Sequence, residues 1–143
     1  MDGFPNPDCA LLADPHLPLI EGVRCLLEAT FESVFIVANA TALRAGIQRL
    51  QPAVVVLDLA FAEGSLREVI AGLKSASSGT RLIALTTHEE PAVAEAALAA
   101  GLDGVVLKRC IARDLLSAVD AVLDRTVFVT KELTGKYVDE PGI

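Results

Sequence analysis

The stretch AVVVLD, residues 53–58, decides the fold. It is an unbroken apolar run that ends in one acid, Asp58, and it shows no alternation of apolar and polar side chains. A strand that is buried on both faces has this pattern, and such strands occur in parallel sheets covered by helices. Four further apolar runs lie along the chain, at residues 9–13, 34–38, 81–86 and 104–108. Their recurrence predicts a parallel sheet of five strands.

The segments between these runs have helical periodicity. In residues 111–124 the apolar side chains fall on one face and most polar ones lie toward the other. Residues 89–100 have Pro91 near the start and Gly101 just past the end, where helices favour these residue types. Residues 66–73 carry a third apolar stripe. The chain therefore predicts an α/β fold in which a β-α unit occurs five times, with right-handed crossovers.

The composition indicates one soluble, cytoplasmic domain with an aliphatic core. The chain has 143 residues, of which 52% are hydrophobic and 4% aromatic, and it lacks tryptophan. No apolar run approaches the roughly 18 residues of a membrane span, and residues 1–8 lack the features of a secretory signal. The net charge of -7 argues against nucleic-acid binding by this chain. Cys9, Cys25 and Cys110 lack metal-type spacing, and because two of them sit in apolar runs we favour small core side chains in a reducing compartment.

Polar side chains close the apolar runs. Asp14 follows the first run, and Asp58, Thr86 and Lys108 end the third, fourth and fifth. Asn39 follows the second run and has no evident task. In open α/β sheets, ligands bind outside the carboxyl ends of the strands. We therefore expect two carboxylates, a hydroxyl and an ammonium to meet at one edge of the sheet.

These four groups suit phosphoryl chemistry. A carboxylate in the position of Asp58 can act as a nucleophile that accepts a phosphoryl group. Magnesium would relieve the repulsion between the two acids, and Lys108 would supply a positive charge for the phosphoryl oxygens. The Thr86 hydroxyl could then bind a phosphoryl oxygen. Each residue alone has a simpler interpretation as a helix cap, a turn residue or a solvated charge, and only their joint placement favours a site.

Four motifs carry a resemblance to a known family. The segments ALLADPHLPLIEGV, VVVLDLAFAEG, LIALTTHEE and AGLDGVVLKRCIARDLLSAV resemble the CheY-like receiver domains of two-component response regulators, most closely the NarL/LuxR-type transcriptional regulators. The resemblance covers residues 9–124. It implies a flavodoxin-like (βα)5 three-layer sandwich with sheet order 2-1-3-4-5. The implied organisation is an N-terminal extension at 1–8, a receiver domain at 9–125 and a linker or tail at 126–143.

The resemblance also implies a role for each site residue. Asp58 matches the phosphoacceptor, Thr86 the switch hydroxyl and Lys108 the lysine that contacts the phosphoryl group and the aspartate. Magnesium would be held by Asp14, Asp58 and the backbone carbonyl of Ala60. Such a domain is a signalling phosphoprotein rather than an ordinary enzyme, and at most it catalyses its own magnesium-dependent phosphotransfer and dephosphorylation.

Two departures from the family pattern bear on that role. Pro15 stands where the family has a second acid, and proline brings neither a side-chain oxygen nor an amide N–H, so we expect weak magnesium binding. Glu63 or a water molecule could replace the missing oxygen. At the position of the family's switching aromatic residue the chain has Val105.

Three functions follow as hypotheses. The first is a receiver domain that takes a phosphoryl group from a sensor histidine kinase and controls an output such as transcription. A homodimer would form through the face of the fourth helix, fifth strand and fifth helix, and a DNA-binding output domain is expected only in a longer protein. The second is a degenerate receiver that acts as an interaction or dimerisation module without phosphorylation. The third, a flavodoxin-like cofactor binder, is disfavoured because DPHLPL lacks a glycine-rich and hydroxyl-rich phosphate loop.

Overall fold

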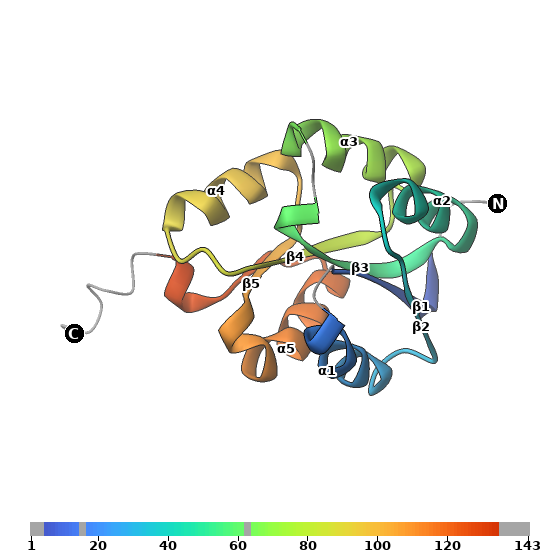
Figure 1. The fold of residues 1–143 in the computed structure, drawn as a ribbon, viewed down its shortest axis with the longest axis horizontal. Coiled ribbons are helices and arrows are strands. Elements are labelled where there is room, and N and C mark those ends of the chain that lie inside the picture. The colour runs from blue at the N-terminus through green and yellow to red at the C-terminus, as the bar shows by residue number, and fades with distance from the viewer. Residues whose placement is uncertain (1–4, 15–16, 62–63, 135–143) are drawn as a thin grey trace.

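A parallel six-stranded sheet forms the centre of the molecule in the computed structural model, which describes residues 5–14, 17–61 and 64–134 (Figure 1). The strand order is β2-β1-β3-β4-β5-β6, and all neighbouring strands are parallel. The strands are β1 (Asn6–Ala13), β2 (Ser33–Ile36), β3 (Pro52–Asp58), β4 (Arg81–Thr86), β5 (Gly104–Leu107) and β6 (Phe128–Val129). The expected order 2-1-3-4-5 is confirmed, and a sixth strand is added to the end beside β5.

Helices cover both faces of the sheet, as expected for a three-layer sandwich (Figure 1). The helices α1 (Leu17–Glu28) and α5 (Ile111–Leu123) pack into one apolar cluster with the sheet. The helices α2 (Ala40–Leu50), α3 (Leu66–Ala76) and α4 (Pro91–Ala100) pack into a second cluster on the opposite face. Three short 3-10 turns complete the fold, namely η1 (Leu59–Phe61), η2 (Lys108–Cys110) and η3 (Lys131–Leu133).

The central strand β3 explains why the apolar runs do not alternate with polar residues. All seven residues of β3 are buried. Val54 and Val56 belong to the cluster under α1 and α5, whereas Val55 and Leu57 belong to the cluster under the other three helices. Because successive side chains of a strand point to opposite faces, a sheet with two covered faces requires apolar residues at every position.

Local signals set the helix ends. Asn39 is the N-cap of α2, and its side-chain oxygen accepts a hydrogen bond of 2.8 Å from the amide of Ala42. This gives a structural task to the residue that closes the second apolar run. Pro91 begins α4, and Gly101 ends it with φ of 114°, a left-handed conformation that suits glycine. Of the three cysteines, Cys9 and Cys110 are buried as expected, but Cys25 is exposed.

The sheet extends beyond both ends of the 9–125 domain expected from the sequence. Strand β1 begins at Asn6, although its first three residues are exposed. Beyond α5, β6 pairs with β5 in the register Gly104↔Phe128 and Val105↔Val129. After β6, Leu133 enters the core with 1% of its surface exposed. Residues 135–143 of the expected tail lie outside the described residues.

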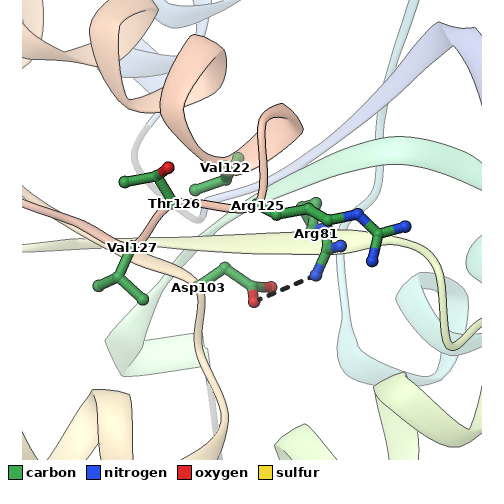
Figure 2. A pocket seen from close by; sticks show the side chains of 6 residues that line it. All are labelled: Arg81, Asp103, Val122, Arg125, Thr126 and Val127. Carbon is green, nitrogen blue, oxygen red and sulfur yellow. Dashed lines mark ion pairs between the residues drawn. The ribbon is translucent and has the colours of Figure 1, made fainter.

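The segment that carries β6 begins near the amino ends of β4 and β5. Thr126 and Val127 line a small pocket of about 40 Å³ there, together with Arg81, Asp103, Val122 and Arg125 (Figure 2). Arg81 pairs with Asp103 across 3.7 Å, and the amide of Phe128 donates to the Asp103 carbonyl at 3.2 Å.

Within the described ranges, no helix is long and apolar enough to cross a bilayer.

We predict that Leu133→Ala lowers the free energy of unfolding by about 2 kcal/mol, because it removes a buried side chain from the core. Leu123→Ala is the matched control, since 43% of Leu123 is exposed, and it should change stability by less than about 0.5 kcal/mol. Urea unfolding measures both values. Equal small effects from the two variants would show that residues 126–134 do not contribute to the core.

Candidate functional site

The polar groups singled out in the sequence meet at the carboxyl edge of the sheet. Asp58 and Thr86 are the last residues of β3 and β4. Asp14 directly follows β1, and Lys108 directly follows β5 as the first residue of η2. Because β1, β3, β4 and β5 are consecutive parallel strands in the sheet, their carboxyl ends lie side by side. The expected gathering of these residues is therefore a property of the fold.

One ammonium joins the two acids. The Nζ atom of Lys108 forms an ion pair with Oδ2 of Asp58 and lies 3.4 Å from Oδ2 of Asp14. Both aspartates are buried, and only 11% of the lysine side chain is exposed. Charges that are shielded from water interact more strongly than surface charges. The three side chains form a cluster of two carboxylates and one ammonium.

The carboxylate of Asp58 is held in one orientation by two neighbours. Its Oδ1 atom accepts a hydrogen bond of 2.7 Å from the backbone amide of Ala60, within the turn that η1 makes directly after β3. Its Oδ2 atom faces Lys108. A carboxylate with its two oxygens fixed in this way presents a defined edge to an incoming group.

A pocket opens over Asp58. It has a volume of about 290 Å³ and is lined by Asp58, Leu59, Ala60, Thr86, Thr87, His88 and Val93. Thr86 is buried, and its Oγ1 atom accepts a hydrogen bond of 3.0 Å from the amide of His88. The simpler interpretation of Thr86 as a helix cap is wrong, because Glu90 is the N-cap of α4. The Thr86 side chain lines the pocket together with Asp58.

The side chains that could hold a metal are Asp14 and Asp58. No group of three or more His, Cys, Asp or Glu side chains gathers anywhere in the residues that the structure describes. Mg²⁺ commonly uses one or two carboxylates together with phosphate oxygens and waters, so two carboxylates at one site fit this ion. Pro15 and Glu63, on which the expectations about the second acid depend, lie outside the described residues.

The position expected to carry a switching aromatic residue lies in the core. Val105 is fully buried in β5, within the cluster under α4, and pairs with Val129 of β6. Sequence reasoning did not assign His88 or Val93 to the site, although both line the pocket. The placement of His88 two residues beyond Thr86 is the signal that could have identified it.

Comparison with known proteins identifies the family. A family model described as the response regulator receiver domain matches residues 10–120. The chain therefore belongs to the response regulator receiver domain family, which consists of signalling domains of two-component systems rather than ordinary enzymes. Members of this family generally bind Mg²⁺ at an acidic site.

The chain is similar to part of two curated transcriptional regulatory proteins. It is 29% identical over 127 residues to the transcriptional regulatory protein UhpA of Salmonella typhimurium, a match that covers 87% of this chain and 63% of UhpA. The UhpA of Escherichia coli gives the same values. The chain thus spans less than two thirds of the length of these relatives.

Two solved structures show the same fold. The receiver domain of the stress response regulator RcsB from Escherichia coli, in its non-phosphorylated form, is 28% identical with a TM-score of 0.72. That match covers 87% of this chain and 99% of the RcsB domain. A LuxR-family response regulator from Aurantimonas is 24% identical, with a TM-score of 0.82 over 96% of this chain and all of that one, and supports the fold alone.

We predict that Lys108→Met lowers the free energy of unfolding by about 3 kcal/mol, because it leaves two buried carboxylates without the ammonium between them. The control is Arg24→Met, which breaks an exposed ion pair with Glu28 and should cost less than about 1 kcal/mol. Chemical denaturation at neutral pH measures both. A Lys108→Met protein as stable as the native one would contradict the role assigned to this ammonium.

Proposed function

We propose that this domain accepts a phosphoryl group on Asp58 from the phosphohistidine of a sensor histidine kinase. The observation that carries the proposal is the arrangement around Asp58, which lines a pocket and whose two oxygens contact the Ala60 amide and the Lys108 ammonium. A buried carboxylate that only stabilised the fold would not need to face a pocket. The carboxylate of Asp58 is oriented by its contacts, and the pocket that it lines would give a phosphoryl donor access to it.

The reaction follows from these contacts. A carboxylate oxygen of Asp58 attacks the phosphorus atom, the new P–O bond forms, and the P–N bond to the kinase imidazole breaks with its electron pair returning to the ring. Lys108 then balances the negative charge that the phosphoryl oxygens bring into the buried site. Thr86 ends the neighbouring strand β4, and in this proposal its hydroxyl would donate its proton to one of these oxygens.

The donor set fits a magnesium ion, which would be held by Asp14, Asp58 and the backbone carbonyl of Ala60. When bound, this ion would neutralise charge on the phosphoryl oxygens during transfer. Pro15 supplies no carboxylate where the family has its second acid, so we infer that magnesium binds weakly. The same site would allow the domain to catalyse its own dephosphorylation.

The partners follow from the same proposal. A sensor histidine kinase supplies the phosphoryl group, and the output is transcription, as in the regulators to which the chain is similar. A homodimer would use the face formed by α4, β5 and α5. Any DNA contact would belong to an output domain in a longer protein, because this chain has a net charge of -7. The location that fits these partners is the cytoplasm.

A second candidate function is an interaction module that works without phosphorylation. Two substitutions favour it: Pro15 removes a magnesium ligand of the family, and Val105 removes the aromatic side chain that would report phosphorylation. The fully buried position of Val105 means that a rotation of this side chain would not change the exposed surface. The two functions differ in one measurable property, the modification of Asp58.

We predict that acetyl phosphate with magnesium adds one phosphoryl group to the native chain and none to Asp58→Asn. The exposed Asp120 on α5 offers a matched control, and Asp120→Asn should be modified like the native chain. Intact-mass spectrometry counts the added groups. A Pro15→Asp variant should reach half-maximal modification at a lower magnesium concentration than the native chain.

The outcome separates the two candidate functions. If the native chain gains no mass at saturating donor and magnesium, phosphoryl acceptance is excluded and the interaction module is favoured. If Asp58→Asn gains the same mass as the native chain, the acceptor is a different residue. If Pro15→Asp has the same magnesium dependence as the native chain, the inference that Pro15 weakens magnesium binding is wrong.

A further inference from the structure

The segment of residues 126–134, which we name the strap, is built onto β5 by backbone and side-chain contacts. It forms the red end of the described chain beside β5 (Figure 1). The amide of Thr126 donates to the Ala121 carbonyl at 2.8 Å, and the amide of Thr130 donates to the Val105 carbonyl at 3.0 Å. Between these points β6 pairs with β5. The strap therefore follows β5 from its start toward the end that carries Lys108.

Thr130 extends this pairing beyond the end of β6. Its side chain is fully buried, and its Oγ1 atom accepts a hydrogen bond of 3.0 Å from the amide of Leu107. The same hydroxyl donates to Oδ2 of Asp114, in the first turn of α5, at 2.8 Å. Leu107 is the last residue of β5, so the hydroxyl satisfies the final amide on the edge of this strand.

Ion pairs hold the strap against α5 around Thr130. Arg113 binds its neighbour Asp114, with Nε 2.8 Å from Oδ1, and also binds both carboxylate oxygens of Glu132 at 3.1 and 2.6 Å. The hydrogen bonds from Arg113 lower the pKa of Asp114 and lower that of Glu132 to about 2. Asp114 and Glu132 are therefore charged at neutral pH, and Asp114 is a fixed acceptor for the hydroxyl of Thr130.

These contacts end one residue before the site. Leu107 is the N-cap of η2, and Lys108 is the first residue of that turn. The hydrogen bond to the Leu107 amide therefore holds the backbone of the residue that directly precedes Lys108. We propose that Thr130 is a positioning residue for Lys108, acting through the Leu107 amide, so that the docked strap sets how well Asp58 accepts a phosphoryl group. This inference rests on the proposed function of Asp58.

The test replaces the hydroxyl and keeps the shape of the side chain. Thr130→Val removes both hydrogen bonds, and Thr130→Ser restores a hydroxyl. With acetyl phosphate and magnesium, we expect Thr130→Val to be modified about fivefold more slowly than the native chain, because only one of its two lost hydrogen bonds, the one from the Leu107 amide, leads to the site. Thr130→Ser should recover most of the rate. In Thr130→Val the maximal rate of modification should fall, whereas the donor concentration that gives half of that rate should stay the same. The reason is that the substitution acts through the position of Lys108.

Thr80→Val is the matched control for a general loss of stability. Thr80 is also a buried threonine, its Oγ1 donates to the Pro52 carbonyl at 2.7 Å, and it lies 2.8 Å from the Ser77 hydroxyl. It precedes β4 and therefore lies at the opposite end of the sheet from the site. Its substitution should lower the melting temperature to a similar extent and leave the rate of modification unchanged.

A second readout does not depend on phosphorylation. The NMR signal of the Lys108 ammonium should shift in Thr130→Val and stay near its native position in Thr130→Ser and Thr80→Val. If the native chain is modified but Thr130→Val is modified at the native rate, the inference is overturned. If the native chain is not modified, the proposed function fails, and an unchanged ammonium signal in Thr130→Val would then overturn the positioning role as well.

Discussion

The contact of the Lys108 ammonium with Asp14 and Asp58 is the interaction on which the rest of the site depends. Two carboxylates at the ends of adjacent buried strands would repel each other in a setting with little water. The lysine offsets this repulsion because its ammonium lies against both carboxylates. This contact requires the carboxyl ends of β1, β3 and β5 to lie at one edge of the sheet. The parallel order of the strands, which are apolar because helices cover both faces of the sheet, provides that arrangement.

Much of this arrangement could be predicted from the sequence because its signals are local. The unbroken apolar runs identify strands that are buried on both faces, and four of the five runs end at, or directly before, a residue of the site. Asp58, Thr86 and Lys108 were located in this way, and the family match supports the fold that brings them together. The N-cap of α2 at Asn39 is also a local signal, although the sequence alone did not show which amide it binds.

The strap could not be predicted because its determinants are distant in sequence. Strand β6 has only two residues, and the pattern around it is that of a polar, turn-rich tail. What keeps it in place is the pairing with β5, the burial of Leu133, and the contacts of Thr130 with Leu107 and Asp114. The two hydrogen bonds of the Thr130 hydroxyl join residues that are 16 and 23 positions apart in the sequence. The run TVFVT at 126–130, rich in β-branched and aromatic residues, is a local hint of a strand.

The central claim is that Asp14, Asp58 and Lys108 act as one phosphoryl-acceptor site. The NMR signal of the Lys108 ammonium, followed during addition of beryllofluoride and magnesium, tests it most directly because beryllofluoride imitates a phosphoryl group on a carboxylate. The account predicts a new Lys108 signal in the native chain and no change in Asp58→Asn. A Lys108 signal that stays at its starting position in the native chain, or that moves equally in Asp58→Asn, would contradict it.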